Sequence, residues 1–253
     1  MTDDAMSAEF DTVAEWTAQT CTRLGADYYL PAACRGSGSP QALDWLMDRL
    51  ALAPGCRLLD SGAGVGGPAA YAVHTRAVHP VLVEPEAGAC RAARRLFGYP
   101  VVQGSGSALP FGDAAFDAAW SLGVLCTMPD QLGLLTELRR VVRPGGGIGL
   151  LVFVATREIA PDEQPEGNRF PTADGLRTLF DEAALEVHAQ QVASELGAAP
   201  QDWEDRADRV DAQMADRYAD SEAWKTSQQQ SERMGSLLGE GAVVGTLFSL
   251  RAS

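Results

Sequence analysis

Short apolar runs alternate with segments of helical periodicity along the middle of the chain. Val81-Leu82-Val83 is one such run, whereas Leu132, Leu135 and Leu138 recur at three-residue spacing. The pattern predicts strands near 57–60, 80–84, 100–103, 116–122 and 147–154, with helices near 68–76, 86–97 and 130–142 between them. This alternation indicates a doubly wound α/β sheet with right-handed crossovers, in which ligands lie beyond the carboxyl ends of the strands.

The two ends of the chain follow other patterns. Apolar residues recur at helical spacing from Glu9 to Leu24, the stretch 25–31 should end that helix, and Ser39 before Pro40 is a good N-cap for the next. After a polar loop, the C-terminal third predicts a helix at 172–184, a strand at 185–192, helices at 202–218 and 221–238, and a last strand at 243–250.

The helices between the last two predicted strands form a large insertion. Roughly 40 residues of helix exceed an ordinary connection. Trp203 and Trp224 in this insertion either line a pocket or hold its helices down. We expect a single domain over 1–253, with a ligand-binding core at 40–155, a helical cap at 196–240 and an N-terminal helical cover at 1–38.

Charge and cysteine content restrict the class of protein. The 253 residues carry a formal net charge of −14 and no basic stripe, which argues against nucleic-acid or anionic-membrane partners. The five cysteines are widely spaced without a C-x-x-C pair, so we expect reduced thiols in the cytoplasm and no metal site. The N-terminus lacks the features of a signal peptide, and no apolar run approaches the ~20 residues of a membrane span.

The stretch from Arg57 to Pro68 reads as a strand, an acid, a glycine-rich turn and a helix start. Gly62 and Gly64 allow a sharp turn and a close approach of backbone to ligand, and Gly67 would let the helix pack close to the sheet. The helix N-terminus turns N–H donors and partial positive charge toward the ligand. The stretch is therefore a nucleotide-binding turn.

Two families of nucleotide-binding proteins share this turn. Gly62, Gly64 and Gly67 fit the G-x-G-x-x-G fingerprint of dehydrogenases, and Glu84 has the spacing of an acid on a ribose hydroxyl. Gly62 and Gly64, with Gly66 as the third glycine, fit equally the D-x-G-x-G-x-G loop of S-adenosylmethionine-dependent methyltransferases. Asp60, two residues before the first glycine, is typical of the methyltransferases.

Four segments decide between the two families. In order, and at normal spacing, they are LLDSGAGVGG (58–67), VLVE (81–84), LPFGDAAFD (109–117) and LRRVVRPGGG (138–147). The chain thus resembles class I S-adenosylmethionine-dependent methyltransferases of the small-molecule type over about residues 40–155, since the last two segments have no counterpart in dehydrogenases. The resemblance implies a Rossmann-like seven-stranded sheet, mostly parallel with an antiparallel last strand, plus a helical cap.

The resemblance also implies an activity and a role for each matching position. The activity is methyl transfer from S-adenosylmethionine, which leaves S-adenosylhomocysteine, to a small-molecule O, N or C nucleophile. Glu84 would accept hydrogen bonds from both ribose hydroxyls. The other implied cofactor contacts are Asp60, Gly62, Gly64 and Gly66 under the methionine and ribose, Pro85, Ser105, Gly106, Ser107, Leu109 beside the adenine, Leu122 in the segment 121–125 near the methyl group, and Tyr28.

One position departs from the family pattern. Where the family usually has an acid that accepts from the adenine amino group, Ser105 stands in the stretch Gly-Ser-Gly-Ser at 104–107. A serine hydroxyl accepts without the assistance of charge, so the cofactor affinity is expected to be lower. A non-catalytic cofactor-binding or regulatory module is the alternative to an enzyme.

The sequence assigns no catalytic residue. His74, His79 and His188 fall away from the predicted strand tips, so a base would be a cap carboxylate, a water or none. Further expectations are that Asp117 anchors its strand, that Tyr28 and Tyr29 either cover the cofactor or belong to a core, that Arg35 is an anion-binding candidate, and that the protein is a monomer or homodimer.

Overall fold

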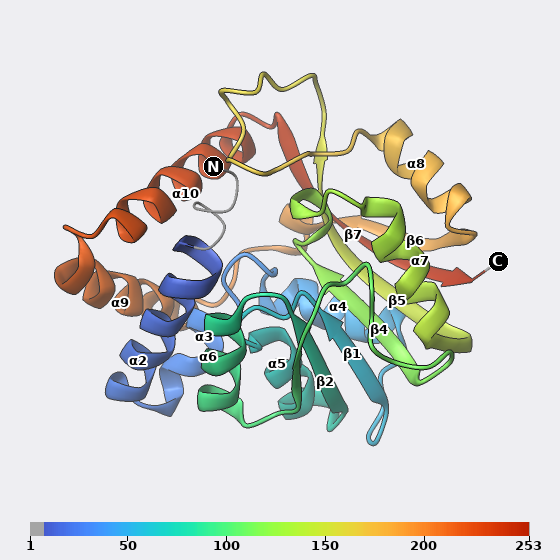
Figure 1. The fold of residues 1–253 in the computed structure, drawn as a ribbon, viewed down its shortest axis with the longest axis horizontal. Coiled ribbons are helices and arrows are strands. Elements are labelled where there is room, and N and C mark those ends of the chain that lie inside the picture. Colours follow the sequence, from blue (N-terminus) through green and yellow to red (C-terminus); the bar gives the residue numbers. More distant parts are fainter. Residues whose placement is uncertain (1–7, 253) are drawn as a thin grey trace.

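The centre of the molecule is a seven-stranded sheet, seen in a computed structural model that describes residues 8–252 (Figure 1). The strand order is β3-β2-β1-β4-β5-β7-β6. β7 runs antiparallel to β5 and β6, and the remaining pairs are parallel, which confirms the predicted sheet. The strands are β1 (Arg57–Ser61), β2 (His79–Glu84), β3 (Val101–Gln103), β4 (Phe116–Leu122), β5 (Val142–Ala155), β6 (Leu185–Val192) and β7 (Val243–Ala252).

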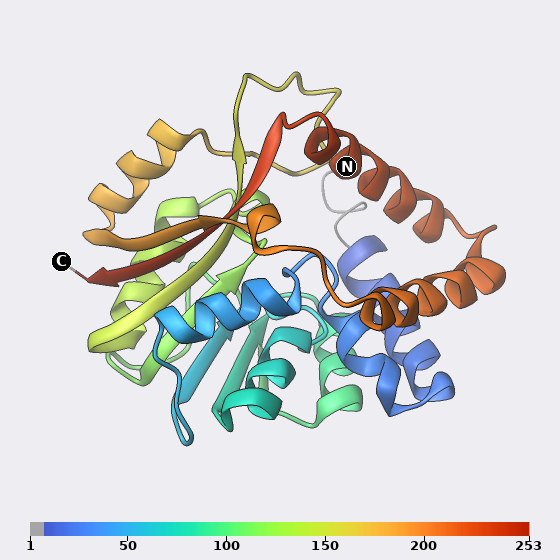
Figure 2. The ribbon, with the colours of Figure 1, turned by 180° about the vertical axis from the view of Figure 1, so that it is seen from behind.

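Helices cover both faces of the sheet (Figures 1 and 2). Leu46 of α4 packs with Trp120 of β4 on one face, while Leu138 of α7 and Phe180 of α8 pack with Ile148 of β5 on the other. None of the helices within residues 8–252 is long and apolar enough to cross a membrane. The α-helices are α2 (Ala14–Leu24), α3 (Tyr29–Ala33), α4 (Pro40–Arg49), α5 (Gly67–Arg76), α6 (Ala87–Phe97), α7 (Gln131–Val141), α8 (Ala173–Glu182), α9 (Gln201–Tyr218) and α10 (Glu222–Gly239).

Three boundaries differ from the sequence-based expectation. β5 begins at Val142 rather than near 147, because Val142 already pairs with Phe116 across an irregularity in the register. The stretch 25–31 does not simply end a helix but enters α3, since Pro31 lies in the first turn, where its missing N–H is not needed. Residues 8–13 form a π-helical turn before α2, whereas regular helix was expected from Glu9 onward.

The N-terminal helix α2 meets α9 and α10, the two helices before β7, in a layer beside the sheet (Figures 1 and 2). Trp16 of α2 stacks on Tyr218 of α9, with ring centroids 4.0 Å apart. Met214 of α9 and Trp224 of α10 are buried in the cluster that contains Ala18 and Cys21 of α2. Trp224 therefore holds the C-terminal helices down, as one of the two expectations for it stated.

Gly67 marks the contact between the N-terminal segment and the glycine-rich turn. A Cβ at this position would collide with the backbone of Ala33 and Cys34 at the end of α3. The sequence predicted that Gly67 allows close packing against the sheet. This prediction is wrong, because the element that lies against Gly67 is α3. Sequence periodicity does not report which element crosses a helix start, so the pattern alone offered no signal.

We predict that Gly67→Ala lowers the free energy of unfolding by about 1–3 kcal/mol, the usual cost of overpacking. The matched control is Gly235→Ala in α10, where a Cβ meets nothing within 4 Å. Because alanine favours a helix interior by up to about 1 kcal/mol, this control should be neutral or stabilising. Urea unfolding of both variants is the measurement, and equal stability of Gly67→Ala and wild type would contradict the contact.

Candidate active site

The glycine-rich loop connects β1 to α5 at the carboxyl edge of the sheet. Gly62, Gly64 and Gly66 have φ angles of 76°, 52° and 86°, in the left-handed region that side chains disfavour. The N–H of Gly62 donates to Val83 O at 2.8 Å and thereby ties the loop to β2. A Cβ at Gly62 would collide with Val124, so the segment after β4 lies against the loop.

Glu84 holds the loop from the end of β2. Its side chain is buried, and its two oxygens accept from Gly64 N at 2.8 Å and from Glu86 N at 3.0 Å. Burial raises the pKa of Glu84, while the two N–H donations oppose that rise. A carboxylate has about four acceptor positions, so these two bonds leave capacity for further donors.

Asp60 lies beneath the loop at the end of β1. The strand register sets it directly beside Trp120 of β4, and both side chains are fully buried. Burial raises the pKa of Asp60 to about 7, and the negative charge of Glu84 adds to that rise. Within residues 8–252, neither Asp60 Oδ2 nor Trp120 Nε1 has a partner at hydrogen-bond geometry.

The end of β4 forms the second wall of the site. Ser121 donates to Ser61 O at 2.8 Å and joins β4 to β1 below the loop. Leu122 is buried. A Cβ at the next residue, Gly123, would lie 2.9 Å from Gly36 O, so the segment between α3 and α4 covers this strand end.

The segment after β3 forms the third wall. Ser107 N donates to Ser105 Oγ at 3.3 Å, and the two hydroxyl oxygens are 3.0 Å apart, so Ser105 caps its own turn. A Cβ at Gly106 would lie 2.9 Å from Ser61 Oγ, which brings this turn against β1. Pro85 O accepts from Gln103 and links the ends of β2 and β3.

Two of the sequence landmarks join in a single hydrogen-bonded cluster. Leu109 N donates to Glu137 Oε2 at 2.7 Å, and Arg140 donates to Leu109 O at 3.1 Å and to Phe111 O at 2.7 Å. Arg140 also binds Glu137, which lowers the pKa of that carboxyl. The Leu-Pro-Phe segment is thus held by α7, the helix that carries the fourth landmark.

The remaining candidates lie outside this site or have partners. Arg35 pairs with Asp211 of α9, so its charge is already neutralised. Asp117 anchors β4, as expected, by accepting from Arg57 N and pairing with Arg143. The three histidines are exposed. Tyr28 and Tyr29 pack against the cluster between α2 and α9, which also takes in Val65 of the glycine loop.

The sequence did not single out two residues that shape the site. Trp120 and Gly36 lie against Asp60 and Gly123 across the chain, whereas Val124, beside Gly62, belongs to the segment 121–125 that the resemblance implied. A signal existed only for Trp120, because a large aromatic residue is out of place among the alanines of β4.

A glycine loop after β1 and a buried acid at the end of β2 define a Rossmann-like nucleotide-binding domain. Residues 59–150 match the family model of the methyltransferase domain. This match places a methyltransferase domain at residues 59–150, as the resemblance predicted. The relatives below support the predicted class I S-adenosylmethionine-dependent methyltransferase family.

Among curated relatives, sterol 24-C-methyltransferase ERG6B of Gibberella zeae is 28% identical over 63% of this chain and 47% of its own length. Sarcosine/dimethylglycine N-methyltransferase of Halorhodospira halochloris is 28% identical over 66% of each chain. The chain spans about half the length, or less, of the first curated relatives that it matches.

Solved structures share the fold. The cyclopropane synthase MmaA2 from Mycobacterium tuberculosis superposes with a TM-score of 0.70 at 14% identity, over 92% of this chain and 96% of its own. Geranyl diphosphate C-methyltransferase from Streptomyces coelicolor A3(2) gives 0.57 at 16% identity, over 83% and 78%. At these identities the likeness concerns the fold alone.

We predict that Asp60→Asn becomes progressively more stable than wild type as the pH rises from about 4 to about 7. The folded-state pKa of Asp60, about 7, lies above the ordinary 3.8, so folding binds a proton in this window and wild-type stability falls with rising pH. At about 1.4 kcal/mol per pKa unit the difference reaches a few kcal/mol. Asparagine does not titrate.

Urea unfolding across this pH range, without added ligand, measures the effect. The matched control is Asp162→Asn, at an exposed loop position. The difference in the free energy of unfolding between this variant and wild type should be the same at every pH. Parallel pH curves for Asp60→Asn and wild type would show that burial does not perturb the Asp60 carboxyl.

Proposed function

We propose that the protein transfers a methyl group from S-adenosylmethionine to an O, N or C nucleophile of a small molecule. The observation that carries the proposal is the buried Glu84 carboxylate, which holds the N–H of Gly64 in the glycine loop. Relatives named for methyl transfer to sterols and to sarcosine support a small-molecule acceptor. They support an enzyme rather than a non-catalytic module.

The residues at this edge of the sheet fit the cofactor. Glu84 retains acceptor capacity for two ribose hydroxyls, and the left-handed glycines leave the loop without side chains toward a ligand. The buried Asp60 Oδ2, without a partner in the described part of the chain, supplies an acceptor under the loop. The residues proposed to hold the cofactor are Asp60, Gly62, Gly64, Gly66, Glu84, Pro85, Ser105, Gly106, Ser107, Leu109, Leu122 and Tyr28.

The bound cofactor supplies a methyl group on a sulfonium, which is already a good electrophile. The chain must therefore position the acceptor in line and exclude water. The tight contact of Gly36 with Gly123 gives the protein a covered strand end for this purpose. No histidine serves as base in this proposal, because all three are exposed.

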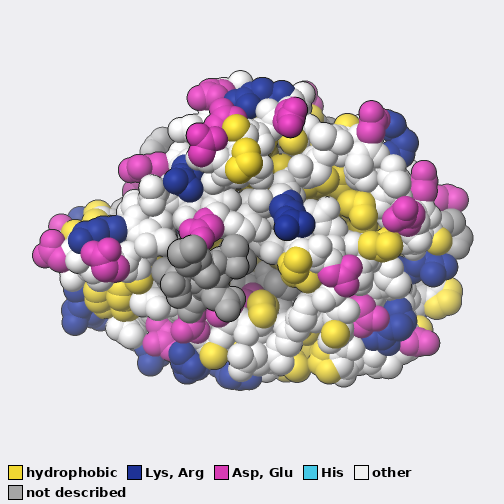
Figure 3. Space-filling model, turned by 45° about the horizontal axis from the view of Figure 1, so that its top comes forward, with side chains coloured by type: hydrophobic (Ala, Val, Ile, Leu, Met, Phe, Trp, Pro, Cys, Tyr) yellow, Lys and Arg dark blue, Asp and Glu magenta, His cyan; other side chains and the backbone are white. Residues whose placement is uncertain are grey.

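The terminal segments 1–38 and 196–240 are proposed to cover the acceptor side of the core at 40–155. Their mutual packing through Trp16 and Tyr218 supports a joint cover. We further propose a cytoplasmic monomer or homodimer without a nucleic-acid or membrane partner. The free thiols of the five cysteines support a reducing compartment. Basic side chains stand scattered among acidic ones on the face drawn in Figure 3.

Calorimetry tests the cofactor class directly. S-adenosylhomocysteine should bind, and NAD should bind at least tenfold more weakly, because the third and fourth landmarks are those of methyltransferases. Comparable affinities for both ligands would refute the proposal. Incubation with labelled S-adenosylmethionine and a panel of small acceptors then tests methyl transfer itself.

We predict that Glu84→Ala weakens S-adenosylhomocysteine binding by about 1.5–3 kcal/mol, the scale of hydrogen bonds to a charged group. Glu84→Gln retains one acceptor oxygen and should lose less. Because Glu84 also holds Gly64 N and Glu86 N, the stability of each variant is measured by urea unfolding alongside calorimetry. An unchanged dissociation constant in a folded Glu84→Ala variant would remove Glu84 from the cofactor site.

A further inference from the structure

β5 extends beyond the carboxyl edge of the sheet, where the glycine-rich loop lies. Gly123 N, just after β4, donates to Leu151 O at 2.9 Å, so the two strands are level at that point. From Leu151 to Ala155 the strand continues for about 13 Å, at about 3.3 Å per residue. Phe153 and Ala155 share a face with Leu151, because side chains alternate along a strand.

A cavity of about 300 Å³ lies at this far end of β5. Ala155, Ile159 and Phe170 provide its apolar lining. They belong to one cluster with Leu237 at the end of α10 and Val243 at the start of β7. The cavity therefore lies between this apolar cluster and the polar loop after β5, which contributes Arg157, Glu158 and Gln164 to its lining.

Phe153 connects the cavity to the strand end beside the cofactor loop. Its ring lies 3.5 Å from the position of a Cβ on Gly123, and it packs against both the α4 cluster and the cavity cluster. Apolar contacts thus continue from Gly123 through Phe153 to the cluster that contains Ala155.

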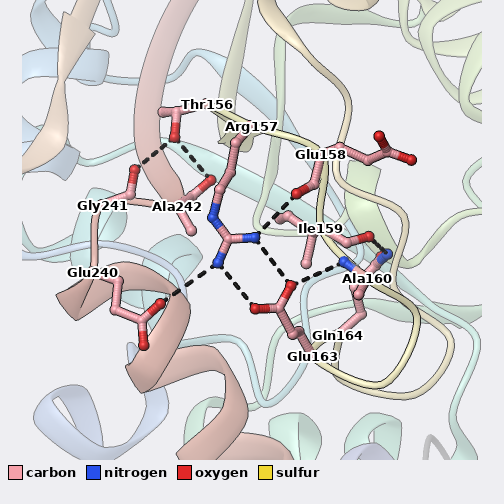
Figure 4. Close-up of polar contacts among 10 residues, drawn as sticks. All are labelled: Thr156, Arg157, Glu158, Ile159, Ala160, Glu163, Gln164, Glu240, Gly241 and Ala242. Carbon is pink, nitrogen blue, oxygen red and sulfur yellow. Dashed lines mark hydrogen bonds and ion pairs between the residues drawn. The ribbon is translucent and has the colours of Figure 1, made fainter.

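Arg157 and Gln164, two polar residues of the cavity lining, already have partners (Figure 4). Both Arg157 Nη atoms lie 3.0 Å from Glu163 oxygens, and Nη2 is 3.6 Å from Glu240. The guanidinium lowers the pKa of Glu163 to about 2. Gln164 donates to Ile159 O at 3.1 Å, and the exposed Glu158 carboxylate points away from Arg157.

We propose that this cavity holds the body of an apolar acceptor, such as an isoprenoid alcohol, with the nucleophilic end directed along Phe153 toward Gly123. The inference rests on the proposed function and names its substrate class. An amino-acid acceptor would require an unpaired cation for its carboxylate. Arg157, the cation at this cavity, is already engaged by Glu163 and Glu240.

Binding of N-phenyl-1-naphthylamine, a neutral apolar fluorophore, tests the cavity without any methyl transfer. The wild-type protein with S-adenosylhomocysteine should bind the fluorophore, and farnesol should displace it, whereas sarcosine should not. Ile159→Asp, which places a charge in the lining, should weaken fluorophore binding at least tenfold. Leu238→Asp, the same change at an exposed position on α10, is the matched control and should bind as wild type does.

Ile159→Trp provides a second variant, because it fills the cavity without introducing a charge and should also exclude the fluorophore. Wild-type fluorophore affinity in both Ile159 variants, or displacement by sarcosine but not by farnesol, would overturn the inference. Calorimetry with S-adenosylhomocysteine on the same samples distinguishes a failure of the apolar-acceptor inference from a failure of the proposed function. Intact cofactor binding with a failed fluorophore test rejects only the apolar acceptor, whereas lost cofactor binding in the wild type rejects the proposed function as well.

Discussion

The bond from Gly64 N–H to the buried Glu84 carboxylate is the interaction on which the candidate site depends. Burial of an ionised carboxylate is costly, and donations from Gly64 and Glu86 offset that cost. In return, one side chain fixes the glycine loop to the end of β2. The loop can take this path because its glycines tolerate left-handed φ angles, so the loop and the acid stabilise each other.

The rest of the molecule closes around this loop through backbone contacts. α3 rests on Gly67, and the segment after α3 rests on Gly123. Since α2 packs against α9 and α10, the two terminal segments and the loop form one connected body. The Arg35–Asp211 pair adds a charged link between the segment after α3 and α9. A movement of α9 and α10 would therefore displace residues that contact the glycine loop.

The proposed acceptor side follows from the length of β5. A strand that ended level with β4 would leave no surface beyond Gly123, whereas the extension to Ala155 provides both Phe153 and the floor of a cavity. The Arg157–Glu163 pair joins two points of the loop after β5, and Arg157 also pairs with Glu240, just after α10. Because these carboxylates neutralise the Arg157 guanidinium, the proposed selection of the acceptor depends on the shape and the apolar area of the cavity.

The sequence determined the order and type of the elements, because apolar periodicity and glycine-rich turns are local properties. It also located Asp60, Glu84 and the four landmarks, since their spacing is fixed along the chain. Only the tertiary structure decided which elements meet: that Trp120 lies beside Asp60, that Gly67 faces α3, and that Arg140 holds the Leu-Pro-Phe segment. Such contacts join residues distant in sequence, and they depend on strand register and helix crossing, which no local pattern encodes.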